Sequence, residues 1–123
     1  TRNVITLSPE KTVSDAIELI RKTGHDGFPV VDSDNRIIGY VSARDLLTKN
    51  PDAKIGDVMV RMIYVAREYM DLRDAARVMF RTGHSKMPVV DEDEKIVGII
   101  TNSDVIRSQI ERADPEKVDK LKR

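Results

Sequence analysis

The sequence predicts an α+β fold, an α/β sandwich made of two β-α-β-β-α repeats related by a pseudo-twofold axis. The first observation is an internal duplication without gaps: residues 1–49 align with residues 60–108 at a shift of 59, and 14 of the 49 aligned pairs are identical. The second is that the same order of hydrophobic patterns occurs in both halves. The third is length, because a unit of roughly 50–60 residues is marginally stable alone. We therefore expect the halves to pack together and share a core.

Repeat one is expected to follow the order strand, helix, strand, strand, helix, over residues 4–7, 13–23, 28–31, 37–41 and 43–47. Thr12 and Asp15 have the spacing of a capping box that starts the first helix, and Gly24 suits the position after its end. Ser42 and Asp45 have the same spacing before the second helix. The polar run at 32–35 predicts a hairpin turn between the last two strands.

Repeat two is expected to copy this plan over residues 62–66, 72–82, 87–90, 95–100 and 102–113. Asp71 takes the capping position of Thr12, and Thr101 with Asp104 repeats the second capping pair. The domain boundaries that follow are 1–53 for repeat one, 54–113 for repeat two and 114–123 for a charged tail or helix extension. Because the chain begins at Thr1, inside an apparent strand, we expect it to be part of a longer protein.

Composition narrows the function classes. The 21 basic and 21 acidic residues give no net charge, which argues against nucleic-acid binding. A charged fraction of 34% is compatible with a thermophilic source. The absence of cysteine excludes disulfides and thiolate metal sites and fits a cytoplasmic location. No apolar run reaches the ~20 residues of a membrane helix, and no signal peptide is visible.

Two patterns recur in register in both halves, and together they carry a family resemblance. Gly24…Phe28-Pro29-Val30-Val31-Asp32 returns as Gly83…Met87-Pro88-Val89-Val90-Asp91, and Gly39…Ser42…Asp45 returns as Gly98…Thr101…Asp104. Over about residues 1–113 the chain resembles a pair of CBS domains, a Bateman module. The resemblance implies a regulatory module rather than an enzyme. Its ligand would be an adenosyl compound held between the repeats: AMP, ADP, ATP, S-adenosylmethionine or methylthioadenosine. It also implies a homodimer of such pairs and an attached enzyme or transporter domain.

The resemblance places the ribose of the ligand at Asp45 and Asp104, since a carboxylate can accept both protons of a vicinal diol. Ser42 and Thr101 would lie near the ribose or the 5′ group, at a helix N-terminus that favours anions. A purely structural interpretation stays open, because Ser-x-x-Asp and Thr-x-x-Asp are also capping boxes that need no ligand.

The remaining site residues follow from family position. The adenine slot is expected at Ile5, Thr6, Phe28, Pro29, Tyr64, Val65, Met87 and Pro88, most of which would be core residues in any version of the fold. Contacts to the 5′ group are expected from Arg44, Lys86 and Asn102. Neither half carries a full basic set, which weakens the case for ATP and leaves room for a ligand without phosphate.

The sequence gives little sign of a catalytic or metal-binding site. No Ser/His/Asp or Cys/His set and no glycine-rich phosphate loop is visible, so no catalytic machinery and no catalytic cofactor is expected. His25 and His84 follow helix-ending glycines, and no metal site is expected there. Two alternatives to ligand sensing remain: a dimerisation or assembly module without a small-molecule ligand, and a nucleic-acid-binding module.

Overall fold

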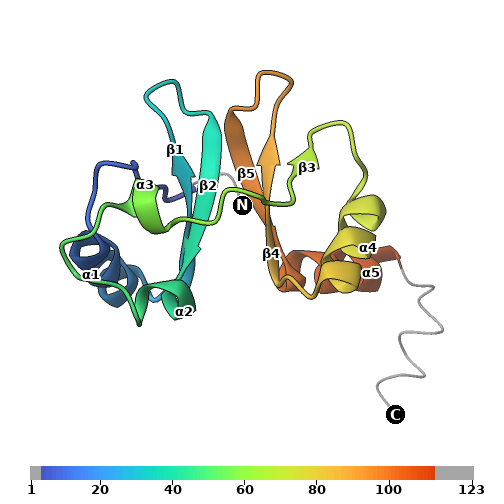
Figure 1. Cartoon of the computed structure of the whole chain (residues 1–123). Helices are drawn as coiled ribbons and strands as arrows, with labels where there is room; N and C mark the ends of the chain where they lie inside the picture. The colour runs from blue at the N-terminus through green and yellow to red at the C-terminus, as the bar shows by residue number, and fades with distance from the viewer. Residues whose placement is uncertain (1–3, 113–123) are drawn as a thin grey trace, which may run out of the picture.

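The computed structural model describes residues 4–112, so the expected tail at 114–123 lies outside the described residues. The elements follow one another as α1 (Val13–Thr23), β1 (Gly27–Val31), β2 (Ile37–Ser42), α2 (Ala43–Leu46), α3 (Ile55–Val58), β3 (Ala66–Arg67), α4 (Leu72–Thr82), β4 (Lys86–Val90), β5 (Ile96–Thr101) and α5 (Asn102–Arg112). The two repeats stand side by side, with β2 next to β5 in the middle and both hairpin turns at the same end (Figure 1).

The helix signals in the sequence are confirmed. Thr12 and Asp15 form the capping box of α1, because each side chain accepts a hydrogen bond from the backbone amide of the other residue. Asp71 also caps α4, where its Oδ1 accepts a hydrogen bond from the amide of Asp74 at 2.9 Å. Gly24 and Gly83 end these helices with φ of 75°, a conformation that favours glycine. Both helices therefore stop at equivalent points, and the chain turns directly into the first hairpin strand.

The two hairpins also match, including an irregularity that the sequence patterns did not predict. β1 pairs with β2 and β4 pairs with β5, both antiparallel, in registers that correspond residue by residue. Val30 lies opposite Gly39, but Val31 lies opposite Ile37, so β2 carries one extra residue. β5 has the same bulge at the equivalent place. A bulge increases local twist, and here it precedes the residues that carry the Ser/Thr-x-x-Asp pattern.

The expectation for the first strand of each repeat is corrected. In place of a strand at 4–7 the structure has a single parallel bridge from Leu7 to Val30. In place of a strand at 62–66 it has β3, which pairs in parallel with β4. In repeat two the reason is that residues 60–66 cross the molecule: Val60 exchanges backbone hydrogen bonds with Tyr40 of β2, whereas Ala66 pairs with Val89 of β4. A segment that spans two sheets pairs only at its ends.

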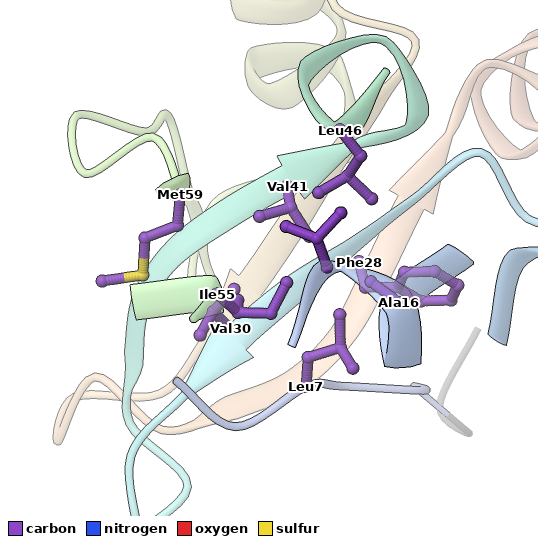
Figure 2. Packing of buried hydrophobic residues seen from close by; sticks show 9 residues of the cluster. Leu7, Ala16, Phe28, Val30, Val41, Leu46, Ile55 and Met59 are labelled. Carbon is purple, nitrogen blue, oxygen red and sulfur yellow. The ribbon is translucent and has the colours of Figure 1, made fainter. Parts of the chain in front are cut away.

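The buried side chains form two clusters rather than the shared core expected from the size of the repeats. The larger cluster belongs to repeat one and includes Phe28, Val30, Val41 and Leu46 (Figure 2). Ile55 and Met59, from the segment between the repeats, complete it. The smaller cluster lies in repeat two around Met79 and Met87. Each hairpin therefore packs on a separate apolar cluster, and the larger cluster also takes in two residues from the start of the 54–113 span.

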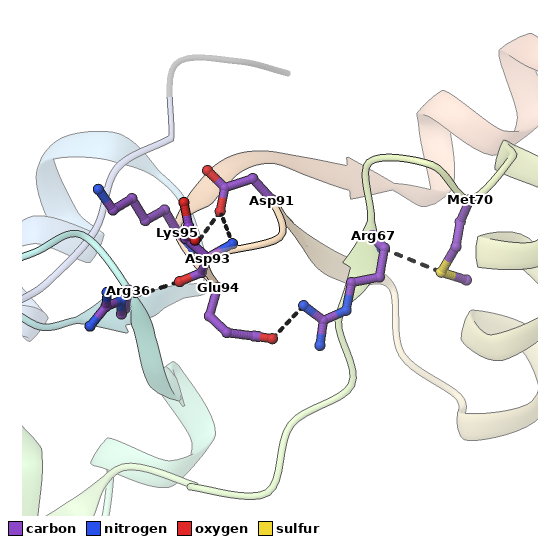
Figure 3. Close-up of polar contacts among 7 residues, drawn as sticks. All are labelled: Arg36, Arg67, Met70, Asp91, Asp93, Glu94 and Lys95. Carbon is purple, nitrogen blue, oxygen red and sulfur yellow. Dashed lines mark hydrogen bonds and ion pairs between the residues drawn. The ribbon is translucent and has the colours of Figure 1, made fainter.

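The repeats are joined at their hairpin turns by main-chain hydrogen bonds. The amide of Ile37 donates to the carbonyl of Glu94, and the amide of Ile96 donates to the carbonyl of Asn35, both at 3.0 Å. Arg36 Nε adds a bond to the carbonyl of Asp93 (Figure 3). Residues 35–37 and 94–96 are named the turn junction below. It aligns the two hairpins edge to edge.

Both turns are shaped for this contact by an aspartate. Asp32 Oδ1 accepts from the amide of Arg36, and Asp91 Oδ1 accepts from the amide of Lys95, each at 3.0 Å. Asn35 and Glu94 then adopt a φ of 66°, which is uncommon for a residue other than glycine. Arg67 holds the Glu94 side chain by an ion pair (Figure 3). The aspartates of the two turns thus have a structural role in shaping the main chain.

The close approach of the crossing segment to β2 gives a first prediction. A Cβ at Gly39 would lie 2.5 Å from Met59 Sδ and 3.0 Å from the Val60 carbonyl oxygen. We expect Gly39→Ala to lower the free energy of unfolding by about 1–3 kcal/mol through overpacking. Chemical denaturation measures this loss. In a Met59→Ala background the same change should cost less, because one of the two obstacles is gone. Full additivity of the two substitutions would contradict the packing described here.

Candidate functional site

A pocket of about 570 Å³ lies at the boundary between the repeats, within the size range of small-molecule sites. One wall comes from β2 and α2 of repeat one, and the other from the crossing segment and the start of β4. The described residues that line it are Asp26, Tyr40, Ser42, Ala43, Arg44, Asp45, Val60, Met62, Ile63, Tyr64, Gly83, His84, Ser85, Lys86 and Pro88. Both repeats contribute, so the pocket exists only while they stay together.

The wall from repeat one carries Ser42, Arg44 and Asp45 at the end of β2. Asp45 Oδ2 accepts from the Ser42 hydroxyl at 2.9 Å and from the Ser42 amide at 3.3 Å. The Asp45 amide donates back to the Ser42 hydroxyl, which closes a capping box. These bonds use one carboxylate oxygen and fix the rotamer of Asp45. They leave Oδ1 without a hydrogen bond from any described residue, as a diol acceptor requires.

The wall from repeat two carries Tyr64, Lys86 and Pro88. Tyr64 comes from the crossing segment, and its ring centre lies 5.7 Å from that of His84 in a tilted arrangement. More than half of the Tyr64 side chain is exposed, although tyrosine rings usually bury their apolar faces. Pro88 lacks a backbone amide, so it has no N–H to leave unpaired in the wall. Together they provide a flat apolar surface beside polar groups.

The electrostatics of the pocket centre on Lys86 and Asp26. Lys86 Nζ lies 2.7 Å from Asp26 Oδ1, which joins the two repeats across the pocket. The hydrogen bond from Lys86 holds the pKa of the Asp26 carboxyl below its usual range. Burial raises the pKa of the Tyr40 hydroxyl to about 12, and the charge of Asp26 adds to the effect. Tyr40 is thus a neutral hydrogen-bonding group at any ordinary pH.

Arg44 and Lys86 line the same pocket, although they come from different repeats. In the sequence, neither half contains a full basic set, and this argued against phosphate. Arg44 of repeat one and Lys86 of repeat two were nevertheless both expected at the 5′ group of the ligand. The structure forms the pocket from the end of β2 in one repeat and the start of β4 in the other, so both cations face one cavity.

The equivalent pattern in repeat two is placed differently. Asp104 Oδ2 accepts from the Thr101 amide at 2.9 Å, and Asp104 Oδ1 accepts from Arg107 at 3.1 Å. Partial burial opposes ionisation of Asp104, but the Thr101 hydrogen bonds outweigh it and its pKa lies below the usual range. Among the described residues, neither Thr101 nor Asp104 lines the pocket above. Both oxygens of Asp104 already have partners within its own helix end.

The other predicted site residues do not line this pocket. Phe28, Pro29 and Met87 are fully buried, the first and last of them in the two cores. Val65 and Thr6 are half-buried, and Ile5 is exposed near the start of the described chain. Asn102 lines a shallower groove between α4 and α5 instead, beside Phe80 and Val105. Their roles as adenine or 5′-group contacts stay predictions.

Several pocket residues were not singled out for this role from the sequence: Asp26, Tyr40, Met62, Ile63, His84 and Ser85. Tyr40 carries the clearest missed signal, because its partner in the duplication is Ile99, and a polar group in place of an apolar one marks a difference between the halves. Asp26 likewise aligns with a different residue, Ser85, in the second half. Met62 is 92% exposed, which is unusual for a methionine and fits the edge of a binding site.

No group of three or more His, Asp or Glu side chains among the described residues is arranged to hold a metal ion. No helix within 4–112 has the length and apolar character needed to cross a bilayer. The pocket between the repeats remains the candidate site.

Comparison with known proteins identifies relatives of this chain and solved structures with the same fold. A protein named uncharacterized protein MJ0188, from Methanocaldococcus jannaschii, is 45% identical over 123 residues, covering 98% of this chain and 46% of the relative. The chain thus spans about half the length of that relative. Among solved structures, CBSX2 from Arabidopsis thaliana in complex with AMP is 34% identical with a TM-score of 0.80, covering 89% of this chain and 91% of that one.

A second structure is that of the cytosolic domain of the Mg²⁺ channel MgtE in complex with ATP. It is 27% identical with a TM-score of 0.82, and the match covers 88% of this chain and 46% of that one. The family model described as the CBS domain matches residues 1–52 and again residues 55–111. Two matches in tandem agree with the duplication, the two hairpins and the pocket between them. The chain belongs to the CBS domain family and contains a pair of CBS domains.

Proposed function

We propose that the chain is a regulatory, non-catalytic module that binds a nucleoside 5′-phosphate of the adenosine class between its repeats. Asp45 accepts the ribose hydroxyls, Tyr64 covers the adenine ring, and Arg44 with Lys86 faces the 5′ phosphate. Binding then changes how the module is arranged and controls an attached enzyme or transporter domain.

One observation carries this proposal: a single pocket collects the residues that each part of such a ligand requires. A diol needs a fixed acceptor, and Asp45 has one oxygen held by Ser42 and the other without a described partner. A purine needs a flat apolar wall, and Tyr64 lines the same pocket.

The charge of the pocket favours phosphate over a sulfonium group. Lys86 already neutralises Asp26, and Asp45 is assigned to the ribose. Arg44 is exposed and forms no ion pair among the described residues. The remaining charge near the 5′ end is therefore positive, which attracts an anion. S-adenosylmethionine and methylthioadenosine are the competing ligands, and a preference for them would reverse this assignment.

The relatives support the ligand class. The CBSX2 structure is a complex with AMP, and the MgtE cytosolic domain is a complex with ATP. Both share the fold of this chain at a TM-score of 0.80 or above. A ligand regulates only through a difference in affinity between two arrangements of the protein. A pocket built from both repeats satisfies that condition, because a shift of one repeat changes its walls.

The ribose assignment gives the second prediction. Asp45→Ala should weaken AMP binding by more than about tenfold, since hydrogen bonds to a charged group contribute about 1.5–3 kcal/mol. Isothermal titration calorimetry measures the loss. Asp104→Ala is the matched control, because it removes the equivalent carboxylate and cap in repeat two but leaves the pocket unchanged.

Loss of a cap costs about 1 kcal/mol, so folding of both variants is checked by circular dichroism. Asp45→Asn is a second variant, which keeps an oxygen for the Ser42 amide. Wild-type protein at 100 times the Kd of AMP should gain about 2.7 kcal/mol of stability. Unchanged AMP affinity in both Asp45 variants would contradict the ribose assignment.

A second candidate function is assembly, as a homodimer of CBS pairs. The observation that favours it is a set of large apolar side chains exposed on the helices. Phe80 on α4 is 92% exposed and Ile106 on α5 is 58% exposed. Leu47, the partner of Ile106 in the duplication, is 81% exposed in repeat one. Exposed apolar groups on both repeats suit a twofold contact with a second copy.

The third prediction tests this surface. Phe80→Arg introduces the residue that repeat one has at the equivalent position, Arg21, and should convert a dimer to a monomer in sedimentation velocity. Tyr69→Arg is the control, because Tyr69 is an equally exposed aromatic residue outside the helices. A monomeric wild type, or a Phe80→Arg variant that still sediments as a dimer, would contradict this surface. A dimer that no adenosyl compound stabilises would favour assembly over sensing.

A further inference from the structure

The ion pair between Lys86 and Asp26 has a special position in the molecule. It is the only ion pair between residues 1–53 and 54–113 in the part of the chain that the structure describes. It lies at the pocket, near the end of the strands away from the turn junction. Lys86 opens β4, and Asp26 precedes β1. The ion pair therefore links the repeats. It also means that Lys86, a cation of the candidate site, already has an anionic partner.

The two partners differ in burial. The Lys86 side chain is 23% exposed, whereas the Asp26 side chain is 74% exposed. Release of Asp26 into water costs little, because its carboxylate is already mostly hydrated. Release of Lys86 without a new partner costs more, because a partly buried ammonium loses hydration. Lys86 is thus poised to exchange one anion for another, and Asp26 is the partner that can leave.

The backbone holds Asp26 in place for this exchange. Its carbonyl oxygen accepts a hydrogen bond of 2.7 Å from the amide of Ala43, at the start of α2. Ala43 stands between Ser42 and Arg44, so Asp26 is fixed beside the proposed ribose and phosphate groups. In the duplicated half the residues equivalent to Asp26 and Lys86 are Ser85 and Gly27, and no such pair can form there. The feature is specific to this pocket.

We propose that Asp26 is a specificity-determining residue that competes with the ligand's 5′ anion for Lys86. In the free protein Lys86 binds Asp26. When a nucleoside 5′-phosphate binds, its phosphate takes Lys86, and the ligand replaces the ion pair as the link between the repeats. Asp26 therefore lowers affinity for anionic ligands and has no effect on the neutral nucleoside. This inference rests on the proposed function, because it presupposes an adenosine-type ligand in the pocket.

The test compares AMP with adenosine by isothermal titration calorimetry. Asp26→Asn should tighten AMP binding by about two- to fivefold, the range that corresponds to an exposed ion pair. Adenosine affinity should stay within twofold. Lys86→Met should weaken AMP binding by at least about tenfold. In the Lys86→Met background, Asp26→Asn should no longer tighten AMP binding, because the ammonium group for which Asp26 and the phosphate compete is absent.

Asp34→Asn is the matched control, since Asp34 also forms an exposed ion pair, with Arg36, in the turn at the far end of the strands. It should leave the affinity for AMP unchanged. Equal tightening of AMP and adenosine by Asp26→Asn, or no tightening of AMP at all, would overturn the inference while leaving AMP binding by the wild type intact. Failure of the wild type to bind either compound would instead overturn the proposed function, and this inference with it.

Discussion

The turn junction is the constraint on which the rest of the structure depends. The two hairpins pack on separate apolar clusters, so the angle between the hairpins is not set by one common core. That role falls to hydrogen bonds of 3.0 Å between residues 35–37 and 94–96. Hydrogen bonds are directional, whereas apolar packing is not, and an edge-to-edge main-chain contact allows few relative orientations. The aspartates of the two turns matter because they shape the main chain that makes this contact.

The candidate site follows from this arrangement. The turns align β2 with β5. Residues 60–66 then run from a contact with β2 to a contact with β4 and form part of one wall of the pocket. The opposite wall is the end of β2 with its capping box. At this end an ion pair between Lys86 and Asp26 links the repeats. The Asp26 side chain is mostly exposed, so the pair contributes little to stability. The repeats are thus linked by main-chain hydrogen bonds at the turns and by an exposed ion pair at the pocket, where a ligand would bind.

The sequence predicted the local structure well and the assembly of the pocket less well. Thr12, Gly24 and their counterparts fixed the helix ends, because caps and left-handed glycines depend on near neighbours only. The first strand of each repeat was predicted too long, and in repeat two its pairing depends on a chain crossing that no local pattern encodes. Asp45 and Lys86 were both predicted as site residues. Arg44 was predicted with them, and all three line one cavity, but Asp26 and Tyr40 were not predicted, because their place at the pocket depends on how the two repeats are joined.

The most direct test of the central claim is to locate the bound nucleotide. We would titrate ¹⁵N-labelled protein with AMP and follow the backbone amide resonances by two-dimensional NMR. The account predicts that the largest shifts fall on residues 42–45, on Tyr64 and on residues 84–86, on both sides of the pocket. Residues 101–104 and the groove between α4 and α5 should shift little. Shifts centred on residues 101–104, or confined to one repeat, would contradict a site built from both halves.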